Sequence, residues 1–161
     1  MDHAHLTDVR TAVAGALAAK ALAPPVVERI GIVGTGVQAR LQLRHLDGIV
    51  DCRRVLAWGR RDEALSRYQQ EMQAEGYDVQ TTRDAAEIGP ACQLIVTVTP
   101  STEPLLRAPE IAPGTHITAV GSDTVGKQEL EAAILIAADR VVVDSLSQCR
   151  ERGELAHALG A

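Results

Sequence analysis

The chain has 161 residues and a formal net charge of -5 at pH 7, and 46% of its residues are hydrophobic and 23% charged. This composition excludes a disordered or fibrous chain and suits one folded domain with its own core. The acidic balance argues against a nucleic-acid partner, and because no apolar run approaches the roughly 18 residues of a membrane span, we expect a soluble, cytoplasmic domain with no membrane contact.

Short runs of β-branched residues alternate with helical patterns, which indicates a parallel sheet covered on both faces. An Ala-rich helix is predicted first, over residues 7–23, ended by Pro24 and Pro25. Six strands are then expected, at residues 29–33, 54–58, 78–81, 94–98, 116–120 and 140–144. Further helices are expected at residues 37–47, 63–75, 84–88, 130–137 and 146–159. The predicted fold class is α/β, with a doubly wound parallel six-stranded sheet of the Rossmann type, preceded by one extra helix.

The cysteines and the N-terminal histidines do not predict a metal site. Cys52, Cys92 and Cys149 lie far apart and lack the spacing of metal ligands, so we expect reduced thiols in a reducing compartment. His3 and His5 have a spacing of two but no third ligand, and they lie where terminal residues are usually disordered. We therefore interpret them as an untethered tail.

The first strand runs into a glycine-rich turn, Gly34-Thr35-Gly36-Val37-Gln38-Ala39. Gly34 would allow the tight turn, Gly36 would let backbone amides approach a pyrophosphate, and Ala39 would let helix and strand pack closely. The N terminus of the following helix offers N–H groups and a partial positive charge to phosphates. Because a second strand follows about 20 residues on, the pattern favours a dinucleotide site. A structural glycine turn and a methyltransferase cofactor site are the alternatives.

The second strand ends in Trp58-Gly59-Arg60-Arg61, where an NAD-selective domain usually has Asp or Glu for the ribose 2′-hydroxyl. A guanidinium suits a 2′-phosphate, which a carboxylate would repel. This pair of arginines therefore favours NADP over NAD. In the alternative interpretation the arginines are a solvated pair, and Asp62 simply caps the next helix.

Polar residues follow the fourth and fifth strands, whose carboxyl ends should carry the chemistry of such a sheet. Thr97 and Thr99 share one face, and Pro100 ends the strand and exposes the loop to the nicotinamide side. Asp123, just past a glycine, and Lys127, four residues on, could provide an acid or base beside a cofactor. Structural threonines, a helix-capping Asp and a surface Lys are the alternatives.

Four segments together resemble the ornithine cyclodeaminase/mu-crystallin family, which includes alanine dehydrogenases and ketimine-reductase-like proteins. They are residues 6–12, which begin Leu6-Thr7-Asp8-Val9-Arg10, the glycine turn, residues 96–101, and residues 114–123, which end Gly121-Ser122-Asp123 and are followed by Gly126-Lys127-Gln128-Glu129-Leu130. A fifth segment, residues 143–145 leading to Gly153-Glu154-Leu155, agrees with the same family. The resemblance implies that Asp123 is the catalytic aspartate and that Arg10 binds the substrate carboxylate near the nicotinamide. The predicted cofactor-binding residues are Gly34, Thr35, Gly36, Val37, Gln38, Arg60, Arg61, Thr97, Thr99, Pro100, Val120, Gly121, Ser122 and Lys127.

The resemblance also implies the chemistry. Hydride passes between the α-carbon of a small amino acid and the nicotinamide of NAD or NADP, through an imine or ketimine. In the cyclodeaminase branch, a side-chain amine then attacks the imine and ammonia leaves. A non-catalytic NADP-binding module of the mu-crystallin kind and oxidative deamination of the alanine dehydrogenase type are the alternatives. Asp123 favours an enzyme, because a pure binder needs no acid at the nicotinamide end.

Members of this family have a substrate and dimerisation domain before the segment that begins at Leu6. We therefore expect the chain to be a fragment of a longer protein. Residues 1–25 would be a helix leading from the absent substrate domain, and residues 26–161 would be the NAD(P)-binding domain. The full-length protein is expected to be a homodimer through the absent domain, and the fragment alone to bind cofactor weakly with little or no turnover.

Overall fold

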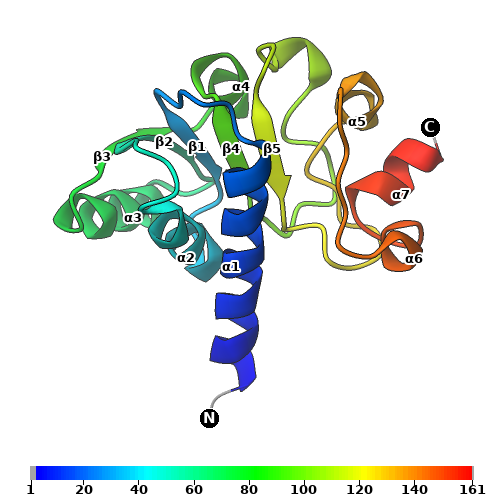
Figure 1. The fold of residues 1–161 in the computed structure, drawn as a ribbon. Coiled ribbons are helices and arrows are strands. Elements are labelled where there is room, and N and C mark those ends of the chain that lie inside the picture. Colours follow the sequence, from blue (N-terminus) through cyan, green and yellow to red (C-terminus); the bar gives the residue numbers. More distant parts are fainter. Residues whose placement is uncertain (1–2, 161) are drawn as a thin grey trace.

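The structure, a computed structural model, describes residues 3–160 and contains one parallel sheet surrounded by helices (Figure 1). The strands are β1 (Ile30–Val33), β2 (Arg54–Trp58), β3 (Asp78–Thr82), β4 (Leu94–Thr97) and β5 (His116–Ala119), in the order β3-β2-β1-β4-β5. Every neighbouring pair is parallel. The chain builds outward from β1 in both directions, so the carboxyl ends of β1 and β4 form a topological switch point, where open α/β sheets bind ligands.

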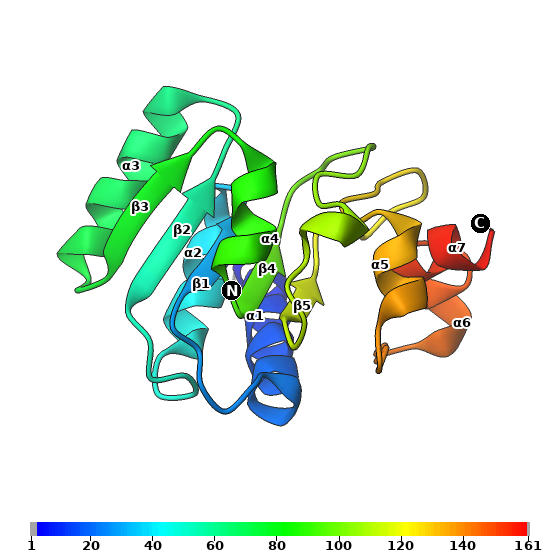
Figure 2. The same cartoon turned by 90° about the horizontal axis from the view of Figure 1, so that it is seen from above.

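The helices differ in how far they reach from the sheet. They are α1 (His3–Leu22), α2 (Val37–Leu46), α3 (Asp62–Ala74), α4 (Ile88–Ala91), α5 (Ala132–Ala137), α6 (Leu146–Cys149) and α7 (Glu154–Leu159), with 3-10 turns η1 (Ala85–Glu87) and η2 (Ala108–Glu110). Helix α1 packs on α2 and contacts β5, and its N-terminal half extends beyond the carboxyl edge of the sheet (Figure 1). Figure 2 shows α5, α6 and α7 grouped beyond β5. Across residues 3–160, the helices lack the combination of length and apolarity that crossing a membrane requires.

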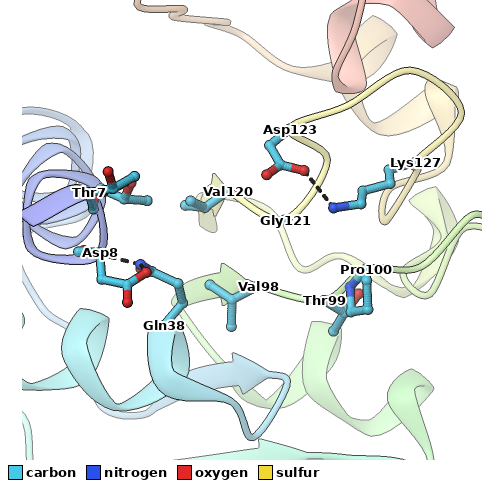
Figure 3. A pocket seen from close by; sticks show the side chains of 11 residues that line it. Thr7, Asp8, Gln38, Val98, Thr99, Pro100, Val120, Gly121, Asp123 and Lys127 are labelled. Atoms are coloured by element: carbon cyan, nitrogen blue, oxygen red, sulfur yellow. Dashed lines mark hydrogen bonds and ion pairs between the residues drawn. The ribbon is translucent and has the colours of Figure 1, made fainter. Parts of the chain in front are cut away.

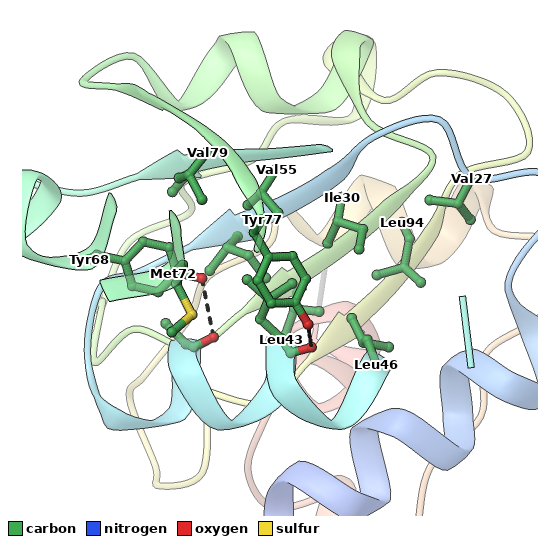
Figure 4. Close-up of a cluster of buried hydrophobic side chains, with 14 of the residues drawn as sticks. Val27, Ile30, Leu43, Leu46, Val55, Tyr68, Met72, Tyr77, Val79 and Leu94 are labelled. Carbon is green, nitrogen blue, oxygen red and sulfur yellow. Dashed lines mark hydrogen bonds between the residues drawn. The ribbon is translucent and has the colours of Figure 1, made fainter. Parts of the chain in front are cut away.

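Both faces of the sheet are buried, as expected for a sheet that is covered on two sides. On one face, Ile30 and Ile32 pack with Leu43 of α2 and with Tyr68 and Met72 of α3 (Figure 4). The cluster on the other face consists of Val33, Leu56, Trp58, Ile88, Cys92, Ile95, Leu106 and Leu130. All residues of β1 and β4 are buried. This explains why these strands are almost continuous apolar runs rather than alternating ones.

The few aromatic side chains are all in the core. The chain has one Trp, two Tyr and no Phe, and Trp58, Tyr68 and Tyr77 are each less than a tenth exposed. Their polar atoms donate to backbone carbonyls: Tyr77 Oη to Leu43 at 3.0 Å and Trp58 Nε1 to Arg83 at 3.0 Å. Each ring therefore adds apolar area without leaving a buried polar group unpaired.

The prediction of a sixth strand at residues 140–144 is wrong. The segment between α5 and α6 has no strand structure, and Val141 and Val142 are exposed by 44% and 63%. The three consecutive valines favour a strand by residue type, but β-propensity mainly reflects burial and pairing, and this segment has neither. Among the described strands, β5 pairs only with β4, so its outer edge is open.

Several predicted boundaries also change. The predicted helix at residues 146–159 is divided into α6 and α7, with Gly153 between them at a φ of 83°. Arg61, not Asp62, is the N-cap of α3, and the Asp62 carboxylate accepts a hydrogen bond from Arg83 at 2.8 Å. The backbone of His3 and His5 belongs to α1, so the prediction of an untethered tail is wrong for these residues. Their side chains lie outside the described part of the structure, so the prediction that they bind no metal is not tested.

Candidate functional site

The turn after β1 has the geometry that its glycine motif predicts. Gly34 has a φ of 125°, a conformation that other residues rarely adopt, and its N–H donates to the carbonyl oxygen of Trp58 at 2.9 Å. Gly36 is the N-cap of α2, and a Cβ built on it would meet no atom within 4 Å. Gly34 therefore makes the turn, and Gly36 leaves open space in front of the N terminus of α2.

Arg40 braces this turn, a role that the sequence did not reveal. Its Nη1 donates to the carbonyl oxygens of Thr35 at 2.6 Å and Gly36 at 3.0 Å. The guanidinium also pairs with Glu71 of α3 and lies 5.4 Å from the ring centroid of Tyr68. Side chains of a helix point back toward its N terminus, so the spacing of four from Gly36 was a usable signal.

A cavity of about 310 Å³ opens at the carboxyl edge of the sheet, between α1, the start of α2 and the loops that follow β4 and β5 (Figure 3). It is lined by Thr7, Asp8, Thr11, Gln38, Val98, Thr99, Pro100, Val120, Gly121, Asp123 and Lys127. Segments that are far apart in the sequence therefore meet here. Of the residues predicted for the site, the cavity brings together Gln38, Thr99, Pro100, Val120, Gly121, Asp123 and Lys127.

Asp123 and Lys127 form an ion pair at the rim of this cavity. Lys127 Nζ donates to Asp123 Oδ1 at 2.6 Å, and the Asp123 side chain is 67% exposed (Figure 3). Ser122 stabilises the same loop, because its Oγ donates a hydrogen bond to the backbone carbonyl oxygen of Lys127 at 2.6 Å. An exposed pair of this kind adds little to stability, about 0–1 kcal/mol. Both residues line the cavity, where a ligand could contact them.

Gln38 links the glycine turn to α1. Its Nε2 donates to the carbonyl oxygen of Asp8 at 3.1 Å and to Asp8 Oδ1 at 3.0 Å (Figure 3). Its Oε1 is buried and has no hydrogen-bond partner among the described residues. Buried polar atoms are rarely left unpaired, so this acceptor in the cavity wall suits a ligand that brings a donor.

The arginines predicted for the site lie outside the cavity. Arg10 is exposed on α1, whose Thr7 and Asp8 line the cavity instead. Arg60 follows β2, and its Nη2 donates to the hydroxyl of Ser101 in the loop after β4, at 3.3 Å. Arg61 is exposed at the start of α3. Arg60 and Arg61 thus lie at the carboxyl end of β2, where the sequence placed them.

Thr97 does not line the cavity, and its surroundings reveal a residue that the sequence analysis missed. Thr97 is fully buried, and its hydroxyl donates to Glu129 Oε2 at 2.7 Å. Glu129 is also fully buried and accepts further hydrogen bonds from Thr99 and Gly121. Burial raises the pKa of Glu129, while the hydrogen bonds from Thr99 and Thr97 act in the opposite direction.

Glu154, at the start of α7, also had no role assigned from the sequence. Its carboxylate accepts from the backbone N–H groups of Glu129 at 2.7 Å and Leu130 at 3.1 Å. Burial raises its pKa also. For Glu129, a signal was present in the sequence: the Gly126-Lys127-Gln128-Glu129 segment was recognised as a motif, but its glutamate was given no role. Only the tertiary structure shows which donors face that side chain.

Comparisons with known proteins agree with this geometry. A model of the ornithine cyclodeaminase/mu-crystallin family matches residues 1–160. An uncharacterized cyclodeaminase, y4tK of Sinorhizobium fredii, is 40% identical over 162 residues, covering 100% of this chain and 49% of that protein. Its coverage shows that the chain spans about half the length of this relative.

Solved structures give the same picture. An archaeal alanine dehydrogenase dimer with bound NAD has a TM-score of 0.93 and 37% identity, covering 99% of this chain and 49% of that one. The iminosuccinate reductase of Paracoccus denitrificans in complex with NAD+ has a TM-score of 0.86 and 32% identity, covering 96% and 48%. Both are similar to this chain over about half of their own length.

Proposed function

The chain belongs to the ornithine cyclodeaminase/mu-crystallin family, and from this we propose that it is the cofactor-binding part of an NAD(P)-dependent enzyme. The reaction would be hydride exchange at the α-carbon of a small amino acid, through an imine or ketimine. One observation carries the proposal: Gln38, at the start of the helix that follows the glycine turn, and the loop of Asp123 and Lys127 line one cavity, at the switch point of the sheet.

The residues present fit a nicotinamide dinucleotide. The open space at Gly36 would admit the pyrophosphate to the N terminus of α2, where the backbone N–H groups of residues 35–38 would hold it. At the other end, Thr99, Pro100, Val120, Gly121 and Lys127 would surround the nicotinamide ribose. A dinucleotide bound there would supply or accept the hydride.

Asp123 would be the catalytic group, holding or moving a proton at the substrate nitrogen from the rim of the cavity. The ammonium of Lys127 would orient that carboxylate. Arg10 would bind the substrate carboxylate through a charge-assisted pair, from its exposed position on α1. We further propose that residues 1–25 connect to a substrate and dimerisation domain and that the whole protein is a homodimer.

Binding of NADH and NADPH to the purified chain tests the first part of this proposal. Trp58 is the single Trp of the chain and lies at the carboxyl end of β2, so quenching of its fluorescence would report the nucleotide. Saturable binding is expected, with little turnover by the chain alone. A chain that is folded by circular dichroism but binds neither nucleotide would refute the proposal.

The choice between enzyme and binding module requires the longer protein. We expect Asp123→Asn to keep the affinity for the cofactor and to abolish hydride transfer to an imine substrate. Glu103→Gln, a carboxylate outside the cavity lining, is the control and should keep both properties. A wild-type protein that binds cofactor but transfers no hydride would favour the mu-crystallin-like module, and unchanged turnover in Asp123→Asn would remove Asp123 from the mechanism.

Oxidative deamination of the alanine dehydrogenase type is a second candidate, favoured by the TM-score of 0.93 to the archaeal enzyme. The two reactions differ in product. Cyclodeamination of ornithine gives a cyclic amino acid, whereas oxidative deamination gives a 2-oxo acid. Analysis of the products of the longer protein, with alanine and ornithine as substrates, would distinguish them.

For the cofactor, we propose a preference for NADP, supported by Arg60 and Arg61 at the end of β2. We expect NADPH to bind more tightly than NADH and Arg60→Ala to remove the difference. Arg67→Ala, an exposed arginine further along α3, is the matched control and should leave the ratio unchanged. Equal or tighter binding of NADH by the wild type, unchanged in Arg60→Ala, would contradict this preference.

A further inference from the structure

The carboxylate of Glu129 collects hydrogen bonds from two strand ends. Oε1 accepts from the Thr99 hydroxyl at 2.7 Å and from the Thr99 backbone N–H. Oε2 accepts from the Thr97 hydroxyl at 2.7 Å and from the Gly121 backbone N–H at 2.9 Å. The end of β4 and the start of the loop after β5 are therefore joined through one side chain, which itself is fully buried.

Both oxygens of Glu129 must be acceptors in this arrangement. A hydroxyl group can turn and change from donor to acceptor, but a backbone N–H can only donate. Because each oxygen faces one backbone N–H, from Thr99 and from Gly121, an amide in place of the carboxylate would direct its NH2 group at one of these donors. Glutamine has nearly the same shape but cannot satisfy both positions, so the site requires a carboxyl group.

The two loops that Glu129 joins are in direct contact. A Cβ on Gly121 would lie 2.2 Å from the Thr99 carbonyl oxygen and 2.6 Å from Glu129 Oε2, so no side chain fits between them. Thr99 and Gly121 both line the cavity, whereas Glu129 and Thr97 lie behind it. The shape of the cavity wall at Thr99 and Gly121 thus depends on Glu129, which is fully buried and not exposed to a ligand in the cavity.

Helix α7 holds Glu129 from the far side. Glu154 accepts from the backbone N–H groups of Glu129 and Leu130, and His157, one turn later, donates from Nε2 to the carbonyl oxygen of Lys127 at 2.8 Å. Two side chains of α7 therefore fix the backbone of the segment that carries Lys127 and Glu129. The helix makes this connection although Glu154 and His157 are not among the residues lining the cavity.

We propose that Glu129 is a positioning residue for the nicotinamide end of the dinucleotide site. Its carboxylate keeps Thr99 and Gly121 together as one binding surface, and α7 keeps Glu129 in place through Glu154. This inference rests on the proposed function, because it assigns Thr99 and Gly121 to the nicotinamide ribose. Glu129 acts through these residues and does not itself contact the cofactor.

The test compares two nucleotides in Glu129→Gln. NADH would extend over the whole site, whereas ADP lacks the nicotinamide and its ribose and probes only the part that binds adenosine and the two phosphates. We expect Glu129→Gln to bind NADH about tenfold more weakly or worse, and to bind ADP within about twofold of the wild type, as measured by calorimetry. Glu131→Gln is the matched control: Glu131 Oε2 also accepts a backbone N–H, from Ala108 at 2.8 Å, but lies away from the cavity, so neither affinity should change.

A selective loss of NADH supports the inference, since a general loss of structure would reduce the affinity for both nucleotides. Unchanged NADH affinity in a folded Glu129→Gln variant, or an equal loss of NADH and ADP, would overturn it. A wild-type chain that binds neither nucleotide would overturn the proposed function and this inference with it. Wild-type binding together with an unaffected variant would overturn this inference alone.

Two milder variants keep the test decisive if Glu129→Gln does not fold. Thr97→Val removes one hydrogen-bond donor to Glu129, and Thr97 itself is fully buried and does not line the cavity. Glu154→Gln disturbs the support from α7. Each should weaken NADH binding severalfold and leave ADP binding unchanged. If both folded variants bind NADH like the wild type, Glu129 does not position the site.

Discussion

Gly36→Ala separates binding from folding at the glycine turn. Gly36 has a φ of -83°, which alanine adopts without strain, and the added methyl group would meet no atom within 4 Å. Alanine is a poorer N-cap than glycine by several tenths of a kcal/mol, but it restricts the unfolded chain by about 0.4–1 kcal/mol. The two effects nearly cancel, so the free energy of unfolding should stay within about 1 kcal/mol of the wild type.

The same methyl group would stand in the space through which the proposed pyrophosphate would approach the N terminus of α2. We expect Gly36→Ala to weaken NADH binding by about 10- to 100-fold, which corresponds to about 1.4–2.7 kcal/mol. Urea unfolding measures the stability, and titration of Trp58 fluorescence with NADH measures the affinity.

Gly34→Ala is the contrasting variant. Gly34 has a φ of 125°, and a Cβ there would lie 3.0 Å from Val98 Cγ2. It should therefore lose about 1–3 kcal/mol of stability. A Gly36→Ala variant that binds NADH like the wild type, or one that is destabilised as much as Gly34→Ala, would refute the separate roles of the two glycines.

Three further predictions concern the core and the sheet. Burial raises the pKa of the Cys92 thiol to about 12, so at about pH 8 Cys92 should react with a thiol reagent only after unfolding, whereas early reaction of all three cysteines would contradict its burial. Burial lowers the pKa of His116, so the stability linked to its neutral form is present above its unfolded pKa and lost as the pH falls through its folded pKa. The free energy of unfolding of His116→Gln should therefore fall less than that of the wild type between about pH 8 and about pH 5. An equal fall of both proteins in urea unfolding would contradict this prediction. Met72 of α3 is fully buried against the sheet, so Met72→Ala should lower the free energy of unfolding by about 2–5 kcal/mol. A loss below about 1 kcal/mol would show that neighbouring side chains fill the space left by the methionine.

Local rules predicted the centre of the fold well. The apolar runs of β1 and β4 and the turn from Gly34 to Gly36 are determined by neighbouring residues, and burial on both faces leaves a clear pattern in the sequence. The segment at residues 140–144 was predicted wrongly, because a strand needs a partner and residue type does not show whether one is available.

Long-range contacts limited the prediction of the candidate site. Asp123 and Lys127 were found because they follow a strand end and lie four residues apart. Glu129 was not, because its partners Thr97 and Thr99 are some thirty positions away. A glutamate in a loop is usually solvated, and only the folded sheet brings these donors around it. Thr97 is the opposite case, a residue that was predicted to bind the cofactor. It shares a face with Thr99, as the alternation indicates, but it is fully buried and does not line the cavity.

The support that α7 gives to Glu129 has a consequence for the order of folding. Synthesis delivers the glycine turn well before Glu154, so the proposed nicotinamide end of the site can be completed only after α7 has emerged and docked. The parallel sheet imposes the same delay, because each strand pairs with a partner that is distant in the chain. Folding of the strands around β1 can therefore form the glycine turn, but the proposed surface for a whole dinucleotide is a late product of the folding reaction.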